Sequence, residues 1–149
     1  MCDMESIQAP PLAEQLCFDL YAASRAVTAA YRPALTELGI TYPQYLVLIV
    51  LWEHESLTVR ELGDELRLDH GTLTPLLKRM ESSGLVERRR DNVDERFVVV
   101  SLAGRGESLR QHAERIQCDM KDQLGLDPQD FEDLQTTLRL LTSRVSPQS

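Results

Sequence analysis

The sequence predicts a mainly α-helical chain with a small β-hairpin wing, arranged as a winged helix-turn-helix between N- and C-terminal helices. Three observations predict this fold: two adjacent amphipathic patterns between residues 58 and 84, two β-prone runs directly after them, and long helical patterns on both sides. Such a unit places its second helix in the major groove of DNA. We therefore expect one domain over residues 1–149, with residues 43–101 as the DNA-binding region.

The two helices of the DNA-binding unit have clear start and stop residues. Thr58 is expected to form a capping box with Glu61, and Asp69 to cap the second helix. The inward stripe of that helix is predicted to be Leu73, Leu76, Leu77 and Met80. Pro75 is expected near the first turn, where the hydrogen bond that a proline removes is missing anyway. Gly84 is expected to end the helix.

The outward face of the second helix carries short polar side chains at its start and cations further on. These residues are His70, Thr72, Thr74, Lys78 and Arg79. Short donors and acceptors near the start of a recognition helix can approach base edges, whereas lysine and arginine bind phosphates. A solvated helix face is the alternative, and this pattern alone does not decide between the two.

The segment RRRDNVDER, residues 88–96, separates the two β-prone runs and predicts the charged loop of a hairpin wing. Its arginines are Arg88, Arg89, Arg90 and Arg96. Arg96 is a candidate for a minor groove, where narrow A·T-rich tracts concentrate negative potential. Asp94 is counted with this DNA-binding set, but it could instead orient an arginine through a bidentate pair.

The overall charge argues against non-specific binding to DNA. The chain has 149 residues, 42% of them hydrophobic, which suits one compact domain, and a formal net charge of −8. Binding would therefore depend on a local basic surface and a matched operator. An acidic protein that acts on a small molecule is the competing interpretation.

The sequence lacks the patterns of several other protein classes. Three cysteines without CxxC spacing and scattered histidines indicate neither a disulfide scaffold nor a zinc site. No signal peptide, membrane-length apolar run, phosphate loop or hydrolase motif is found. We expect no metal, no cofactor, no membrane partner and no enzymatic activity, in a reducing cytoplasmic setting. Cys2 lies in an N-terminal segment without a structural pattern and is expected to have no specific role.

The helices outside the DNA-binding unit are predicted over residues 12–38 and 103–145. Pro33 is expected to kink or break the first of them. The second divides at Gly125 and Asp127 into helices over 103–123 and 128–145. Between them, residues 43–53 start with a proline at the first helical position and are apolar nearly all round, which predicts a buried central helix.

These outer helices predict a homodimer. They have too few partners within one chain to bury their apolar stripes, and a second copy solves that problem. A two-fold dimer also places two recognition helices one DNA turn apart, ~34 Å, as a palindromic operator requires.

Four segments carry a resemblance to a known family. They are LCFDLYAASRAV (16–27), YRPALTELGITYPQYLVLIVLWE (31–53), DHGTLTPLLKRMESSGLVERRR (69–90) and DERFVVVSL (94–102). They resemble the MarR family of regulators along nearly the whole chain, and within it the organic-hydroperoxide sensors of the OhrR type. The resemblance implies a single MarR-type domain and a repressor that releases operator DNA when an organic hydroperoxide oxidises a cysteine near the start of the first helix.

The resemblance assigns that cysteine to Cys17, and the tyrosines that hydrogen-bond its thiolate to Tyr31 and Tyr42, with Tyr21 close by. Tyr31 is fourteen residues from Cys17, ~21 Å along a straight helix. Unless the helix folds back, contact across the dimer is the simpler solution. The alternatives are a buried structural cysteine and aromatic packing.

Cys118 follows Cys17 by 118 − 17 = 101 residues, on a late helix. Some members of the branch carry a second cysteine there, and others trap the sulfenic acid with a small thiol. Our hypothesis is that Cys118 of one subunit attacks the sulfenic acid on Cys17 of the other. An unrelated helix thiol is the alternative.

Two other functions remain open at this point. One is a MarR-type repressor that a small phenolic or apolar ligand releases, with no redox switch. The other is a thiol peroxidase, which the sequence disfavours because Arg25, two turns away, is the nearest arginine that could polarise a substrate at Cys17.

Overall fold

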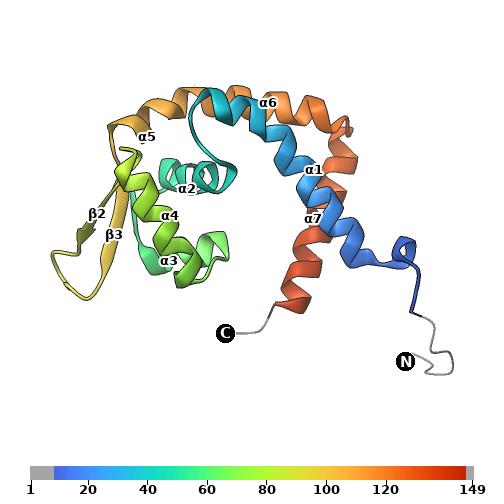
Figure 1. The fold of residues 1–149 in the computed structure, drawn as a ribbon, viewed down its shortest axis with the longest axis horizontal. Helices are drawn as coiled ribbons and strands as arrows, with labels where there is room; N and C mark the ends of the chain where they lie inside the picture. Colours follow the sequence, from blue (N-terminus) through green and yellow to red (C-terminus); the bar gives the residue numbers. More distant parts are fainter. Residues whose placement is uncertain (1–8, 147–149) are drawn as a thin grey trace.

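Helix α2 (Tyr42–Glu53) lies at the centre of the computed structural model, which describes residues 9–146 (Figure 1). Its buried side chains are Tyr45, Val47, Leu48 and Leu51. At its start, the side-chain oxygen of Gln44 accepts the N–H of Thr41 at 3.0 Å. The predicted buried helix is confirmed, although it begins at Tyr42, so that Pro43 takes the second helical position instead of the first.

The helix-turn-helix consists of α3 (Val59–Leu66) and α4 (His70–Ser82). Thr58 and Glu61 form the expected capping box, with bonds of 2.8 and 3.2 Å between each backbone N–H and the other side chain. The carboxylate of Asp69 accepts the N–H of Thr72 at 2.7 Å. The four residues of the predicted stripe of α4 are buried, and Gly84 follows the helix with φ of +73°. The predicted caps, buried stripe and terminal glycine of this unit are therefore confirmed.

Pro33 and Pro75 lie in the interiors of helices, beyond the first turn. The break expected as one outcome at Pro33 does not occur, because α1 (Leu16–Glu37) is one helix, and a kink at this residue stays a prediction. Residues Leu12–Glu14 form a separate 3-10 turn, η1, so the long helix starts at residue 16 instead of 12. Pro75 is the sixth residue of α4, beyond the first turn, so it does remove one helical hydrogen bond. In α1, burial of Leu35 to 2% exposure beyond the proline favours a continuous helix.

The wing belongs to a three-stranded antiparallel sheet with strand order β1-β3-β2. Its strands are β1 (Ser56–Thr58), β2 (Val86–Arg90) and β3 (Val98–Leu102). The hairpin is confirmed, but three arginines assigned to its loop lie on β2, where Arg88 pairs with Val100 and Arg90 with Val98. The loop is therefore shorter, over residues 91–97. Strand β1 was not predicted because three residues carry no alternation that could identify a strand.

The predicted helix over residues 103–123 is divided. It consists of α5 (Gly104–Ser108), the 3-10 turn η2 (Leu109–His112) and α6 (Ala113–Leu124). Just before the division, the backbone at Gly106 packs closely against Leu85. A Cβ at Gly106 would meet the carbonyl oxygen of Leu85 at 2.1 Å. Helix α7 (Pro128–Val145) begins as predicted, with Asp127 accepting the N–H of Asp130 at 2.9 Å.

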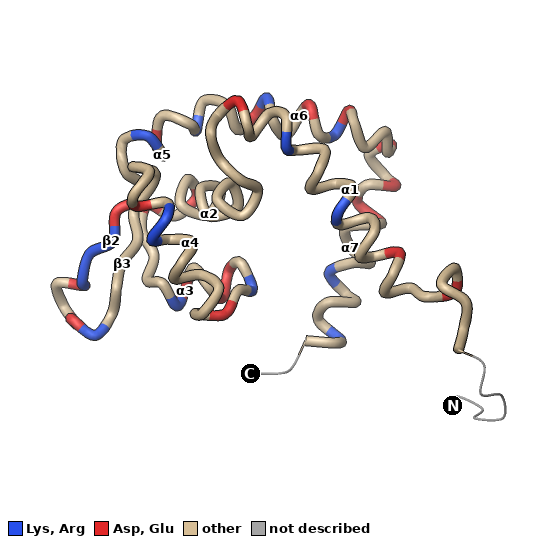
Figure 2. Tube along the Cα trace, viewed as in Figure 1, with Lys and Arg blue, Asp and Glu red and all other residues tan. Residues whose placement is uncertain are grey.

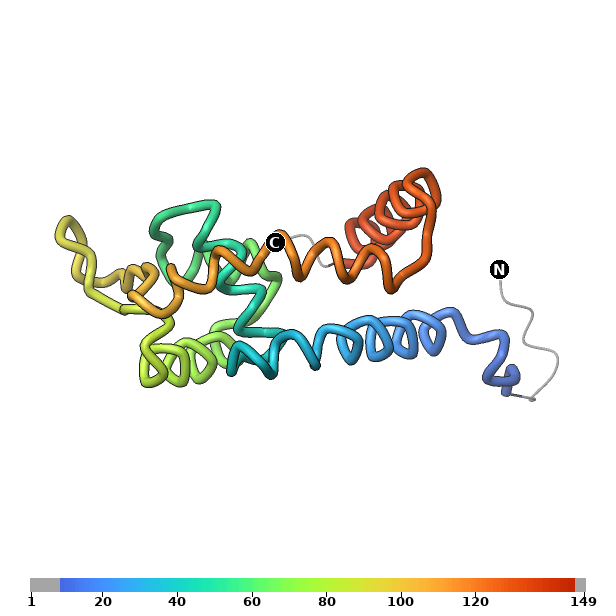
Figure 3. The backbone as a smooth tube through the Cα atoms, turned by 90° about the horizontal axis from the view of Figure 1, so that it is seen from above, coloured from blue at the N-terminus to red at the C-terminus, as the bar shows by residue number. Residues whose placement is uncertain are grey.

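Helices α1 and α6 lie side by side and lead away from the wing, and α7 lies at their far end (Figure 3). Arg115 of α6 meets Glu37 of α1 at 3.8 Å, and Ile116 and Met120 are buried. Helix α7 buries no residue, and its Leu134 is 49% exposed. The assignment of residues 12–38 and 103–145 to dimerisation stays a prediction.

No single helix among residues 9–146 is long and apolar enough to cross a membrane, and α1 and α2 meet those limits only as a pair bent by 77°.

Candidate functional site

The start of α4 presents the predicted base-reading residues to solvent. His70 and Thr72 are exposed and Thr74 is half-buried, and the hydroxyl of Thr74 lies 3.3 Å from Nε2 of His70. The hydroxyl of Thr72 donates to Asp69 at 3.1 Å. The backbone and side-chain hydrogen bonds from Thr72 hold the pKa of Asp69 below its usual value, so the cap stays charged at neutral pH. Lys78 continues the same exposed face, which is therefore available to DNA.

Arg96, near the tip of the wing, is held by Asp94. Its Nε lies 3.0 and 3.1 Å from the two carboxylate oxygens, and Nη2 lies 2.6 Å from Oδ2. These bonds lower the pKa of Asp94. The side chain of Arg96 nevertheless stays 84% exposed. The bidentate pair considered for Asp94 is thus present, and its carboxylate orients the exposed guanidinium of Arg96.

The three arginines of β2 differ in their surroundings. Arg88 forms an ion pair with Glu81 of α4 and is half-buried, so its guanidinium ties the wing to the recognition helix. Arg90 donates to the carbonyl of Glu95 at 3.2 Å across the hairpin. Arg89 is exposed. Sequence reasoning did not identify Glu81 because no local pattern links residues on a helix and a following strand.

The cations are unevenly distributed over the chain. Figure 2 shows lysine and arginine positions on α4, along β2 and near the tip of the hairpin, with acidic positions interleaved among them, whereas both signs alternate along α6. On α4, Lys78 and Arg79 are both exposed. In a chain with a formal net charge of −8, these interleaved cations are the groups of this region that suit a phosphate backbone.

Cys17 is the second residue of α1 and is exposed, so it is not part of the core of its own chain. The side chain of the N-cap residue, Gln15, makes no capping hydrogen bond. The first turn of a helix has backbone N–H groups without helical partners, and its dipole favours a negative charge.

Tyr31 and Tyr42 form a ring pair where α1 meets α2, with centroids 5.0 Å apart. The ring of Tyr45, which sequence analysis did not single out, lies 5.9 Å from that of Tyr31. Burial raises the pKa of Tyr31 and of Tyr42, and for Tyr31 the neighbouring Tyr42 adds to the effect. Burial, with smaller contributions from both rings, raises the pKa of Tyr45 to about 12. All three phenols are therefore protonated donors at neutral pH.

The cysteine and the tyrosine pair do not meet within one chain. Because α1 is one helix, Tyr31 lies ~21 Å along the axis from Cys17. Tyr21 lies one turn from Cys17, is exposed, and has the guanidinium of Arg25 at 5.3 Å from its ring centroid.

Cys118 lies on α6 and is exposed. The buried face of α6 packs against the second half of α1, as the Arg115–Glu37 contact and the lining of a small cavity by Ala30 and Met120 show. A disulfide needs Cα atoms within ~7 Å. Since residue 30 is thirteen residues beyond Cys17, ~20 Å along α1, Cys118 cannot reach the Cys17 of its own chain.

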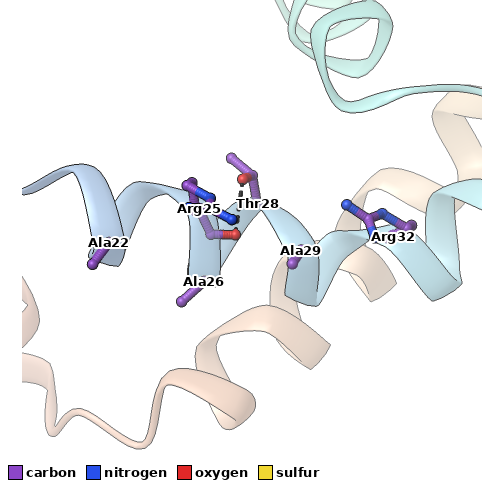
Figure 4. A pocket seen from close by; sticks show the side chains of 6 residues that line it. All are labelled: Ala22, Arg25, Ala26, Thr28, Ala29 and Arg32. Carbon is purple, nitrogen blue, oxygen red and sulfur yellow. Dashed lines mark hydrogen bonds between the residues drawn. The ribbon is translucent and has the colours of Figure 1, made fainter.

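Two further hollows border α1. The first, of about 540 Å³, is lined by residues of α1 alone, with the small side chains of Ala26 and Ala29 between Arg25 and Arg32 (Figure 4). The second, of about 570 Å³, lies at the corner between α1 and α2 and includes Tyr42 in its lining. Among residues 9–146, no three His, Cys, Asp or Glu side chains are placed together to hold a metal ion. Cys2 lies outside the described residues.

The known proteins that this chain resembles are transcriptional regulators. The family model "Transcriptional regulator SarA/Rot" matches residues 29–113. The chain is 54% identical over 123 residues to the organic hydroperoxide resistance transcriptional regulator of Bacillus subtilis (strain 168). That match covers 83% of this chain and 82% of the relative.

Solved structures of AbfR, known from Staphylococcus epidermidis, resemble this chain in sequence and fold. Reduced AbfR bound to DNA superposes with a TM-score of 0.68 and 41% identity, over 87% of this chain and 93% of the other. The disulfide form of AbfR gives a TM-score of 0.61 and 42% identity, over 87% and 91%. A protein similar to this chain has thus been seen both on DNA and with a disulfide.

Proposed function

Because the chain belongs to the MarR family of transcriptional regulators, within its organic-hydroperoxide-sensing branch, we propose that it is a repressor that releases operator DNA when Cys17 is oxidised. DNA binding and cysteine-based sensing belong to this group. The observation that carries the assignment to Cys17 is its exposed position in the first turn of α1. We place the repressor in the cytoplasm, where its operator lies.

The proposed active form is a homodimer. Helix α7 leaves Leu134, Leu138 and Leu140 exposed, and α1 has a hollow beside its alanines. A second copy would cover both surfaces. It would also place two α4 helices on successive major grooves of a palindromic operator, ~34 Å apart.

The proposed sensor site is shared between subunits. Tyr31 and Tyr42 of one chain would donate hydrogen bonds to the Cys17 thiolate of the other, since neither chain can bring its own groups together. This arrangement links thiol chemistry to the relative position of the two DNA-binding regions.

The redox reaction is proposed in two balanced steps. The Cys17 thiolate attacks the outer oxygen of an organic hydroperoxide, ROOH, forming cysteine sulfenic acid and releasing the alcohol ROH after protonation. The thiolate of Cys118 from the other subunit then attacks the Cys17 sulfur, forming the disulfide and releasing hydroxide, which is protonated to water. The thiol is consumed in each cycle until a reductant restores it, so it acts as a switch instead of a turnover catalyst.

A second candidate function is release by a small phenolic or apolar ligand without redox chemistry. It is favoured by the hollow of about 570 Å³ at the corner of α1 and α2, which is lined by Leu35, Ile40 and Tyr42 among others. In that case Cys17 would be irrelevant to release.

The test is operator binding measured by fluorescence anisotropy with DNA from upstream of the chain's own gene. Wild-type protein and Cys17→Ser are compared before and after cumene hydroperoxide. We expect equal binding of both reduced proteins and loss of binding in the wild type alone. Release of Cys17→Ser by peroxide would contradict the assignment, and unchanged binding of both would favour the ligand-released repressor.

A further inference from the structure

The side chain of Arg105 on α5 connects the ends of two helices. Its Nη2 donates to the carbonyls of Leu38 and Gly39 at 3.0 and 3.2 Å, directly after α1. Its Nη1 donates to the carbonyl of Ser83 at 3.1 Å, directly after the recognition helix α4. These residues are far apart in the sequence, and the guanidinium brings them to one point.

The hydrogen bonds of Arg105 are of a kind that holds two helix ends in a fixed relative position. The last carbonyls of a helix lack helical partners and carry its negative dipole end, so two such ends attract one cation. A guanidinium is planar and has five donors, which lets it satisfy both ends in a set orientation.

Helix α5 itself is held on other sides. The carbonyl of Gly106 accepts the indole N–H of Trp52 on α2 at 3.0 Å. The backbone at Gly106 also packs so closely on Leu85 that no Cβ would fit. Arg105 therefore projects from a segment that is anchored to α2 and to the start of the wing.

The position of the first helix end matters for regulation. Residues 38–41 form the corner between α1, which carries Tyr31, and α2, which starts at Tyr42. Tyr31 and Tyr42, the proposed partners of the sensor thiolate, thus lie on either side of the corner to which Nη2 of Arg105 is hydrogen-bonded. Nη1 of the same guanidinium is hydrogen-bonded to the residue directly after α4.

We propose that Arg105 is a positioning residue that couples the tyrosine pair to the recognition helix. This inference rests on the proposed function. When oxidation removes the thiolate from the tyrosines, the corner moves, and Arg105 transmits that movement to the end of α4. Without the guanidinium, Cys17 is still oxidised, but operator affinity responds less.

Substitutions at two positions, Arg105 and Gly39, test this coupling. Arg105→Gln removes the cation, and Arg105→Lys keeps the charge without the fork. Gly39→Ala acts from the other side, because its Cβ would lie 2.8 Å from Nη2 of Arg105. The control for Arg105 is Arg110→Gln, which changes an exposed arginine whose carboxylate partner, Glu107, is 3.6 Å away. The control for Gly39, whose φ is +69°, is Gly125→Ala: Gly125 has a φ of +61° but open space where a Cβ would lie.

The readout is the ratio of operator affinity in the reduced and peroxide-treated states, measured beside the rate of Cys17 thiol loss and the thermal unfolding midpoint. We expect this ratio to fall at least about fivefold in Arg105→Gln and Gly39→Ala, with Arg105→Lys intermediate. Thiol loss stays within about twofold of wild type, and both controls switch normally. A purely structural role would lower the unfolding midpoint and leave the ratio intact.

The inference is overturned if wild type switches and Arg105→Gln and Gly39→Ala keep the wild-type ratio. If Arg105→Gln does not fold, Arg105→Lys and Gly39→Ala decide by the same criterion. A wild type that does not switch at all contradicts the proposed function instead, so the two failures are distinct.

Discussion

The rings of Tyr31 on α1 and Tyr42 on α2 lie 5.0 Å apart between centroids and are inclined by 47°. Both are half-buried, and burial raises the pKa of each phenol above 10. Two neutral donors therefore sit together at a helix corner, at a place that Cys17 of the same chain cannot reach. Such a pair can stabilise an anion brought by another chain.

Replacing Tyr31 by phenylalanine is expected to slow oxidation of Cys17. Loss of a hydrogen bond to a charged group costs about 1.5–3 kcal/mol, which corresponds to a reaction of Cys17 that is slower by about tenfold or more. The measurement is the pH profile of Cys17 alkylation by iodoacetamide. Tyr45→Phe is the control, since Tyr45 lies buried behind the pair. An unchanged profile in Tyr31→Phe would argue that the tyrosines only pack.

Cys118→Ser is expected to abolish the disulfide without stopping the first oxidation. Both cysteines are exposed, but they lie too far apart within one chain, so the disulfide must join two subunits. After cumene hydroperoxide, wild type should run at twice the monomer mass on a non-reducing gel. Cys118→Ser should run as a monomer whose Cys17 reacts with dimedone. A monomeric wild type with oxidised Cys17 would reject the resolving role.

Arg96→Ala is expected to lower operator affinity by about 1–3 kcal/mol if the arginine reads bases, or to reduce the salt dependence of binding by about one ion if it contacts phosphate. Asp94→Asn should weaken binding less, because the exposed guanidinium loses its orientation but keeps its charge. Arg110→Ala, outside the DNA-binding region, is the control. Anisotropy titrations over a range of salt concentrations distinguish these cases.

The pH dependence of the Asp94–Arg96 ion pair follows from the lowered pKa of Asp94. Arg96 lowers the pKa of Asp94, so the carboxylate is charged at any pH above its ordinary value of 3.8 and the pair is lost only as the pH falls below it. Operator binding should therefore show no titration from Asp94 between pH 5 and 8. A step in that range that Asp94→Asn removes would contradict this account.

Alkaline unfolding should depend on Tyr45, which is 4% exposed. Its pKa is raised from 10 to about 12 in the folded protein, so its contribution to stability is complete below pH 10 and lost as pH rises toward 12. The difference corresponds to at most about 3 kcal/mol. Tyr45→Phe should flatten the fall of the urea midpoint between pH 10 and 12, with exposed Tyr21→Phe as control. An equally steep fall in both variants would show that other groups govern alkaline unfolding.

Local sequence patterns determined most of the helices. Thr58 and Asp69 begin helices because their side chains accept N–H groups within the next turn, and Gly84 ends one because it adopts a positive φ. The exposed face of α4 and the hairpin followed from the same short-range rules. The resemblance along the chain then pointed to Cys17 as a sensor, a role that position alone would not have suggested.

Contacts between distant segments decided the rest. Helix α1 runs through Pro33, and the helix predicted over residues 103–123 divides at η2, directly after α5, whose Gly106 packs against Leu85. Likewise, the Arg88–Glu81 ion pair and the bonds of Arg105 join groups that no short-range pattern relates. Where a cap or a terminal glycine is present, the start or stop of a helix can be located from the sequence, because these signals act within a few residues. Which helix ends and side chains meet depends on how whole elements pack, so no short-range pattern identifies those contacts.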